Sequence, residues 1–290
     1  MSRKGIILSG GQGTRLFPAT LALSKQLLPI YNKPMIYYPL STLMSLEIKE
    51  ILIITTPFDF NRFRFLLGDG SKWGINLKFK IQEKPNGIAE AFILAENFID
   101  NSPSTLILGD NLFYGNKLAT RLRGFSKKTE GATIFAYPVN NPEEYGIVDF
   151  NKEKKIISIK EKPSNPKSKY AVTGLYFYDK NVVKIAKSLK PSERGELEIT
   201  DLNNTYLLDK KLEVCFLDEG DTWLDAGSND TLMEAAQFIK TIENRQGIKV
   251  SCPEEIAWKK GWINNQELEN LAKEFSKNEY GKYLMKLIKK

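Results

Sequence analysis

The sequence predicts an α/β fold: a mixed, mostly parallel central sheet flanked by helices, with a C-terminal helical appendage. Short β-branched runs alternate with longer helical patterns in the first part of the chain, as in sheets whose parallel strands are joined by crossover helices. Polar loops follow several of these runs, and the chain from about residue 229 onward is mostly helical in pattern. At 290 residues, the chain can form one large domain or two modest ones.

The first 130 residues carry the expected parallel part of the sheet. Apolar runs bounded by turns predict buried strands, and the periodic segments between them predict helices. The expected strands are Lys4–Leu8, Glu50–Thr56, Leu77–Gln82 and Thr105–Leu108, and the expected helices are Pro34–Met44, Phe58–Leu67 and Ile88–Phe98. Because ligands bind at the carboxyl ends of strands in such sheets, we expect the polar loops after these strands to meet at one crevice.

From residue 132 the expected strands follow one another more closely. They are Ala132–Tyr137, Gly146–Phe150, Lys155–Lys160 and Tyr170–Tyr178, then helices Lys180–Leu189 and Glu198–Leu208, then late strands at 211–217 and 222–225. A seam near Thr241–Gly247 marks the predicted start of the appendage. The predicted division is therefore a domain of residues 1–240, in halves of about 1–130 and 131–240, and an appendage of residues 241–290.

The composition excludes several kinds of chemistry. The chain has no histidine, which excludes Ser-His-Asp and Cys-His catalysis and argues against a transition-metal centre. Its net charge of +7 comes from scattered basic residues, so we expect an anionic small molecule as the ligand and no nucleic acid. No apolar stretch approaches the roughly 20 residues of a membrane span. Two isolated cysteines, Cys215 and Cys252, predict reduced thiols in the cytoplasm.

The stretch GIILSGGQGTR, residues 5–15, predicts a strand followed by a phosphate-binding loop. It matches neither the P-loop nor the dinucleotide fingerprint, because no Lys-Ser or Lys-Thr follows and Leu16 stands where the third glycine belongs. Arg15 can make two hydrogen bonds to a phosphate, and Lys25 adds a second positive charge. A tight turn with two solvated cations is the alternative. Backbone N–H groups can approach phosphate oxygens freely at glycines, here Gly10, Gly11 and Gly13.

Two aspartates follow expected strands and can hold a hard metal ion. Asp110 lies in LGDN after a buried strand, and Asp225 ends TWLD next to a glycine. Mg²⁺ prefers oxygen ligands and keeps several waters, so two carboxylates suit it. For Asp110 alone, a helix N-cap is the better interpretation, and only a second carboxylate such as Asp225 favours the metal site.

A second group of motifs lies in the closely spaced strands. Gly146 and Gly174 permit close approach of the backbone, Glu161 can bind sugar hydroxyls, and Lys162 can neutralise a phosphate. A charged surface turn closed by proline is the alternative interpretation of the Glu-Lys-Pro tripeptide.

Taken together and in this order, the motifs resemble those of the sugar-nucleotide pyrophosphorylases. They are GGQGTRL, SKQLLPI, GDN, EYGIV, EKP, TGLYFYD, RGELEITD and WLDAG. YNKPMIYYPLSTLM, GDGSKWG and RQGIKVSCPEEIAW extend the resemblance nearly end to end, in particular to bacterial glucose-1-phosphate thymidylyltransferases. The resemblance implies a Rossmann-like nucleotidyltransferase domain with a nucleotide-binding half and a sugar-binding half. It implies a cytoplasmic homotetramer that uses Mg²⁺, dTTP and glucose 1-phosphate to make dTDP-glucose and pyrophosphate, the first step toward dTDP-deoxysugars such as dTDP-L-rhamnose.

The resemblance also assigns roles to particular residues. Arg15, Lys25 and Lys162 match catalytic cations, and Asp110 and Asp225 match the magnesium ligands. The nucleotide-binding set is Gly10, Gly11, Gly13, Thr14, Gln26, Gln82, Gly87 and Asp110, in which Gln26, Gln82 and Gly87 match the residues that read the base. The sugar-phosphate set is Tyr145, Gly146, Glu161, Lys162, Val172 and Trp223. A possible regulatory nucleotide site matches Tyr114, Gly115, Glu255 and Ile256, although Asn116 stands where relatives have histidine.

Three alternatives remain open at this point. A preference for UTP would make the enzyme a uridylyltransferase. The family usually has a proline directly after Gln82, whereas this chain has Glu83-Lys84 there, and this difference in the base-reading loop can change the preferred base. A non-catalytic sensor of nucleotide sugars could use the same fold, but it has no need for the complete set of cations and aspartates. A glycosyltransferase of similar fold typically carries a D-x-D motif, and the sequence has none.

Overall fold

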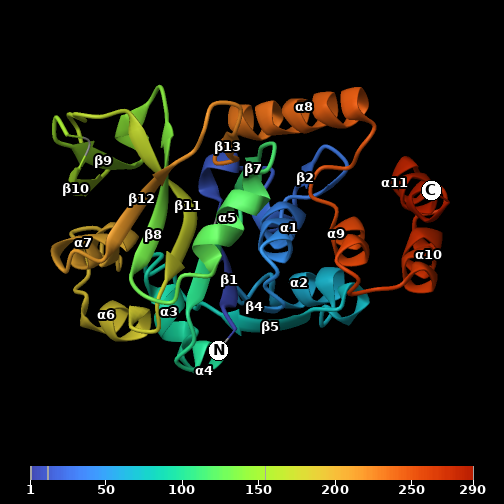
Figure 1. Ribbon diagram of the computed structural model, residues 1–290, viewed down its shortest axis with the longest axis horizontal. Helices are drawn as coiled ribbons and strands as arrows, with labels where there is room; N and C mark the ends of the chain where they lie inside the picture. Colours follow the sequence, from blue (N-terminus) through green and yellow to red (C-terminus); the bar gives the residue numbers. More distant parts are fainter. Residues whose placement is uncertain (1, 12, 154, 290) are drawn as a thin grey trace.

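A nine-stranded mixed sheet forms the centre of the molecule (Figure 1). The computed structural model describes residues 2–11, 13–153 and 155–289. The strand order is β10-β9-β11-β6-β1-β4-β5, with β8 paired to β11 and β12 paired to β8. The bounds are β1 Lys4–Ser9, β4 Glu50–Thr55, β5 Asn76–Ile81, β6 Ser104–Leu108, β8 Ala132–Pro138, β9 Gly146–Phe150, β10 Ile156–Glu161, β11 Tyr170–Tyr178 and β12 Leu212–Phe216. The predicted fold class is confirmed.

The two halves of the sheet differ in strand direction. β6, β1, β4 and β5 are parallel, as expected for the first half. β11 runs antiparallel to β6 through Leu175–Tyr178, and its first residues leave β6 and pair with β8 and β9. The register of β11 shifts between Val172 and Tyr176. Gly174 of the second group of motifs lies within this shift.

Helices cover both faces of the sheet, because successive residues of each buried strand point to opposite faces. Ile7, Ile51, Ile53 and Ile107 pack under α1 (Tyr37–Ser45), α2 (Phe60–Leu67) and α5 (Leu118–Ser126). Their neighbours Ile6, Leu52, Ile54 and Leu106 pack under α3 (Glu90–Leu94), α4 (Glu96–Ile99), α6 (Val182–Ser188) and α7 (Ile199–Leu208). These parallel strands are therefore buried on both sides, which explains their continuous apolar sequences.

Two predicted helices differ from the structure, and several elements went unpredicted. The helix expected from Pro34 begins at Tyr37, because Pro34 belongs to a hairpin of β2 (Pro29–Ile30) and β3 (Lys33–Pro34). The helix expected over 88–98 is divided into α3 and α4 at Ala95. No element was predicted between 109 and 131, where the structure has β7 (Asn111–Tyr114) and α5. β7 has only four residues and pairs with β13 (Thr222–Asp225), more than 100 residues away, so no local pattern marks it.

The C-terminal part of the chain is helical, as expected. α8 (Asn229–Gln246) begins at a capping box between Ser228 and Thr231 and lies along the top of the molecule in Figure 1. α9 (Pro253–Lys259), α10 (Asn265–Glu274) and α11 (Glu279–Ile288) share one apolar core with α1 and α2. The predicted domain limit at residue 240 falls inside α8, and the division into domain and appendage stays a prediction. No helix in the described ranges is both long and apolar enough to cross a membrane.

We expect Tyr280→Phe to lower the midpoint of thermal unfolding by several degrees. The Tyr280 hydroxyl donates to the buried Glu254 carboxylate at 2.6 Å, and the Trp73 indole donates to its other oxygen at 3.1 Å. A buried acceptor that loses its donor costs about 1–3 kcal/mol. The control is Tyr114→Phe, whose hydroxyl donates to Gln246 at an exposed position. Equal midpoints for the two variants would contradict this account of how α11 is held.

Candidate functional site

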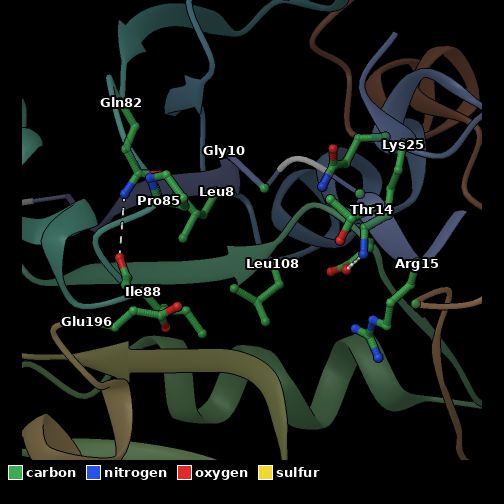
Figure 2. Close-up of a pocket in the computed structure, with 16 residues that line it drawn as sticks. Leu8, Gly10, Thr14, Arg15, Lys25, Gln82, Pro85, Ile88, Leu108 and Glu196 are labelled. Carbon is green, nitrogen blue, oxygen red and sulfur yellow. Dashed lines mark hydrogen bonds and ion pairs between the residues drawn. The ribbon is translucent and has the colours of Figure 1, made fainter. Parts of the chain in front are cut away.

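The loops that follow β1, β5 and β6 meet at one cavity, as predicted from their places at the carboxyl ends of these strands. The cavity has a volume of about 290 Å³. Its lining includes Leu8, Gly10, Gly11, Gly13, Thr14, Arg15, Lys25, Gln26, Gln82, Pro85, Gly87, Ile88, Leu108, Asp110, Glu196 and Gly227. In Figure 2, Thr14, Arg15 and Lys25 lie at one end, and Gln82, Ile88 and Glu196 lie at the other. All eight residues of the predicted nucleotide-binding set line this cavity.

The glycine loop turns sharply at Gly13 and then forms a short 3-10 helix, Thr14–Leu16. Gly13 has a φ of +64°, which glycine adopts at little cost. Its carbonyl accepts a hydrogen bond from the Thr20 hydroxyl at 2.7 Å, which holds the turn. A Cβ at Gly10 would clash with the Gln82 side-chain oxygen. The small residue at position 10 therefore lets the Gln82 amide enter the cavity.

The loop after β5 is held by a distant segment. Gly87 has a φ of +104°, and a Cβ there would clash with the Leu197 backbone. Leu197 N–H donates to Asn86 at 2.7 Å, and Ala89 N–H donates to the Leu197 carbonyl at 3.1 Å. This contact also brings Glu196 into the wall of the cavity. RGELEITD thus helps to shape the cavity, although the sequence analysis gave that motif no site residue.

Gln82 is held in a defined orientation. Its Nε2 donates to the Glu90 carboxylate at 2.7 Å, and its oxygen faces Gly10. A carboxylate accepts only, so it fixes which end of the amide points toward it. Gln82 is 4% exposed. The Gln82 amide therefore has a fixed orientation in the ligand-free protein, and a ligand meets its hydrogen-bonding groups in that orientation.

Asp110 and Asp225 lie side by side across the two-stranded ladder of β7 and β13. Asp225 pairs with Asn111, and Ala226 N–H donates to the Asp110 carbonyl at 3.2 Å. Burial opposes ionisation of Asp110, but the adjacent Lys25 ammonium and a hydrogen bond from Asn111 hold the pKa of Asp110 below its ordinary value. Burial and the Asp110 charge raise the pKa of Asp225 from 3.8 to about 7. At neutral pH Asp110 is therefore ionised, and ionisation of Asp225 beside it is energetically unfavourable.

This donor set fits a hard divalent cation. Both side chains offer oxygen only, and a divalent cation would relieve the repulsion that raises the pKa of Asp225. Within the described ranges no group of three or more acidic, cysteine or histidine side chains gathers as a metal cluster. Two carboxylates without further protein ligands suit an ion that completes its shell with phosphate oxygens and water.

The three predicted catalytic cations lie in different surroundings. Lys25, which is 8% exposed, forms an ion pair with Asp110. Arg15 is exposed and lies against Gly227, where an added Cβ would come 3.1 Å from its guanidinium. In the described part of the chain, neither Arg15 nor Lys162 forms an ion pair with a carboxylate. These two cations are therefore available to an anionic ligand.

Most of the predicted sugar-phosphate set gathers beside β9, β10 and β13. The Glu161 carboxylate accepts from the Thr200 hydroxyl at 2.7 Å and lies next to Gly146. Lys162 follows directly, with a φ of +39°, and its N–H donates to the Tyr145 carbonyl at 3.0 Å. The rings of Tyr145 and Trp223 pack edge to face, with centroids 5.4 Å apart. Val172 lies at the shift in β11 described above.

Asn111 connects this set to the carboxylate pair, and the sequence analysis did not single it out. Its side-chain oxygen accepts from the Trp223 indole at 2.6 Å and from Gly174 N–H at 2.9 Å, and its Nδ2 donates to Asp110 at 3.0 Å. Arg194 was also missed, and its guanidinium lies 2.8 Å from Glu198 and 3.6 Å from Glu161. Both residues belong to quoted motifs, GDN and RGELEITD, but only the fold reveals these contacts.

A second cavity, of about 450 Å³, contains part of the possible regulatory site. Tyr114, Gly115 and Ile256 line it, together with Lys249 and Lys259. Glu255 is not in the lining, but its carboxylate lies 2.6 Å from the Lys259 ammonium. Three of the four predicted residues thus meet in one cavity, separate from the first.

Residues 4–242 match the family model described as nucleotidyl transferase. The chain belongs to the nucleotidyl transferase family. A family member from Neisseria meningitidis, named glucose-1-phosphate thymidylyltransferase, is 54% identical over 99% of this chain and 100% of its own length. One of the same name from Mycobacterium tuberculosis is 51% identical over 99% of both chains. The predicted resemblance is therefore confirmed.

Solved structures of the family agree with the fold. A Bacillus anthracis protein assigned as a glucose-1-phosphate thymidylyltransferase superposes with a TM-score of 0.76 at 41% identity, over 82% of this chain and 95% of its own. A UDP-glucose pyrophosphorylase complexed with UDP-glucose superposes with a TM-score of 0.71 at 23% identity, over 83% of this chain and 99% of its own. At that identity the second likeness shows the fold alone.

We expect Asp225→Asn to stabilise the metal-free protein, and more so at pH 8 than at pH 5. The pKa of Asp225 is about 7 when folded and ordinarily 3.8, so the folded state binds more protons between these values. The free energy of unfolding therefore falls as pH rises through this window, and the asparagine variant escapes that loss. Thermal unfolding in EDTA at both pH values measures the difference. The control is Asp230→Asn, an exposed position in α8. An equal gain for Asp225→Asn at both pH values would contradict the assigned pKa.

Proposed function

We propose that this chain is a glucose-1-phosphate thymidylyltransferase, which transfers a deoxythymidylyl group from dTTP to α-D-glucose 1-phosphate and releases pyrophosphate. One observation carries the proposal, and it is the position of the Asp110–Asp225 pair. On one side of the pair lies the cavity with the glycine loop and the cations. On the other side lies the set of residues around Glu161 and Trp223. A transferase that joins a nucleotide to a sugar phosphate needs this arrangement. The names of relatives at 54% and 51% identity support the assignment.

The chemistry follows from the charges. An oxygen of the sugar phosphate attacks the α-phosphorus of dTTP in line, the bond to the β-phosphate oxygen breaks, and pyrophosphate leaves. The nucleophile is already an anion, so no general base is required, which is consistent with the absence of histidine. The barrier is the approach of two polyanions and the charge that develops on the leaving oxygens. Positioning and positive charge lower such a barrier.

Each cation has a place in this scheme. Arg15, at the glycine loop, neutralises the triphosphate, and Lys162, next to Glu161, neutralises the sugar phosphate. Lys25 holds Asp110 in the ligand-free protein and is close enough to the glycine loop to bind the triphosphate. Asp110 and Asp225 would hold Mg²⁺, which supplies further positive charge to the phosphates when it is bound. The family generally uses a divalent metal.

Base and sugar recognition are assigned to the two ends of the site. Gln82, oriented by Glu90, reads the base with Gln26 and Gly87, and apolar Leu8, Ile88 and Leu108 line the same cavity. A C5 methyl in an apolar pocket is worth only about 1 kcal/mol, so UTP is the natural second substrate. Glu161, Gly146, Val172, Trp223 and Tyr145 hold glucose. Tyr145 stays neutral there, because burial and the nearby Asp225 raise its pKa to about 12.

We place the enzyme in the cytoplasm, as a homotetramer that feeds dTDP-deoxysugar synthesis. These statements rest on the resemblance, and native mass spectrometry tests the tetramer.

The test is pyrophosphate release from glucose 1-phosphate and each of dTTP, UTP, ATP, CTP and GTP separately, with Mg²⁺. We expect the highest rate with dTTP, the next highest with UTP, and loss of activity in EDTA that Mg²⁺ restores. Lys162→Ala should lower kcat/KM about 100-fold or more, because electrostatic stabilisation of developing charge is lost. The matched control is Lys160→Ala, an exposed lysine two residues away in β10.

The other outcomes decide between the alternatives. A clear preference for UTP would make the enzyme a uridylyltransferase and direct attention to Glu83-Lys84. No release with any nucleotide, together with binding of dTDP-sugars, would favour a sensor without catalysis and would contradict the proposed function.

A regulatory role for the second cavity is a separate proposal. Lys249 and Lys259 lie in the lining, where each is paired with a carboxylate, Glu243 and Glu255, so an anionic nucleotide would compete with these carboxylates for the two ammonium groups. We expect saturating dTDP-L-rhamnose to lower the initial rate in a manner not competitive with dTTP. An unchanged rate, or purely competitive inhibition, would reject regulation through this cavity.

A further inference from the structure

A cluster of buried charged residues lies outside the first cavity and has no part in the proposed chemistry. Glu243, near the end of α8, has a side chain that is 1% exposed. One carboxylate oxygen accepts from the Lys33 ammonium and from Val250 N–H, each at 3.0 Å. The other accepts from Asn32 at 2.6 Å and from Lys249 at 2.7 Å. Every lone pair of this carboxylate is thus engaged, which is how a buried charge is tolerated.

The cluster joins three parts of the fold. Asn32 lies at the tip of the β2–β3 hairpin and Lys33 is the first residue of β3. Glu243 belongs to α8, and Lys249 and Val250 line the second cavity. Lys33 has a side chain that is 2% exposed and lies 4.9 Å from the Tyr38 ring. Burial lowers the pKa of Lys33 and the Glu243 charge opposes that change. The hairpin tip is therefore fixed chiefly by one carboxylate.

The hairpin is hydrogen-bonded to the segment that contains Lys25 and Gln26, and both of these residues line the first cavity. Lys25–Leu27 form a short 3-10 helix directly before β2. Across the hairpin, Ile36 N–H donates to the Gln26 carbonyl and Met35 N–H to the Leu28 carbonyl, each at 2.9 Å. Behind the hairpin, Ile30, Met35 and Tyr38 share one apolar cluster with residues of α8 and its surroundings: Ala235, Ile239, Leu112, Ala226 and Val250. A change at the tip can therefore move the backbone of Lys25 and Gln26.

We propose that Glu243 is a positioning residue for nucleotide binding, which sets Lys25 and Gln26 by fixing the tip of the β2–β3 hairpin to α8. The proposal rests on the proposed function for the role of Lys25 and Gln26. Glu161, Trp223 and the other residues assigned to glucose lie on elements that the hairpin does not carry. Loss of the anchor should therefore weaken nucleotide binding and leave sugar-phosphate binding unchanged.

The test is Glu243→Gln in the full chain, with Lys33→Met and the double variant. Glutamine keeps the shape of the side chain but leaves the buried Lys33 ammonium and the partly buried Lys249 ammonium without this counter-charge. We expect the KM for dTTP and the calorimetric Kd for dTTP to rise about tenfold, with the KM for glucose 1-phosphate within twofold of wild type. In the double variant these values should match those of one single variant, because both changes break the same anchor.

The control is Glu254→Gln, which alters a carboxylate of similar burial that contacts Trp73 and Tyr280 but not the hairpin. It should lower thermal stability without changing either KM. A merely structural role for Glu243 would lower the active fraction, and thus kcat, with both KM values unchanged, and that result would overturn the proposal. So would equal rises in both KM values, or the same rise in Glu254→Gln.

The binding measurement separates this proposal from the proposed function. If wild-type protein binds dTTP but releases no pyrophosphate, the proposed function fails, and the Kd values of the variants still decide the role of Glu243.

Discussion

The repulsion between two neighbouring carboxylates is the constraint on which the rest of this structure depends. Asp110 and Asp225 come from segments more than 100 residues apart, and the antiparallel ladder of β7 and β13 holds them together. Like charges at close range in a half-buried place are unfavourable, as the raised pKa of Asp225 shows. The fold offsets this cost for Asp110 with the Lys25 ammonium and the Asn111 amide. The negative charge of the pair that is not compensated attracts a divalent cation, and the bound cation in turn attracts a polyphosphate.

The elements around this pair hold it from several sides. Lys25 reaches Asp110 from the segment before the β2–β3 hairpin, and α8, which packs on that hairpin, starts four residues after Asp225. Asn111 has one side-chain oxygen, which accepts from both Trp223 and Gly174, while its amide nitrogen donates to Asp110. The same side chain therefore connects the carboxylate pair with the residues assigned to glucose.

Close approach of the backbone recurs where the cavity is formed. Gly10 leaves room for Gln82, Gly87 for the Leu197 backbone, and Gly174 for the Asn111 side chain. In each case the neighbour is a polar group that needs a defined position, and a Cβ would displace it. Glycine here serves contacts made across the fold more than flexibility of the loop itself, and only Gly87 of the three also has a positive φ.

The sequence by itself determined the α/β class, the succession of most strands along the chain and the identity of most residues around the cavity. Buried parallel strands have continuous apolar sequences, and GGQGTR and GDN mark the loops at the ends of two of them, so local patterns suffice for both. Only the tertiary structure decided which of these loops touch. β7 is too short to show a pattern, Pro34 belongs to a hairpin whose pairing sets the start of α1, and Asn111 and Arg194 gain their contacts from segments up to 112 residues away.

Glu243 shows the same limit: in the sequence it is one charge on an amphipathic helix, and its four partners come from the hairpin tip and the 249–250 loop. Sequence patterns report the periodicity of one element, whereas hydrogen bonds and charges between elements depend on distances that only the folded chain defines.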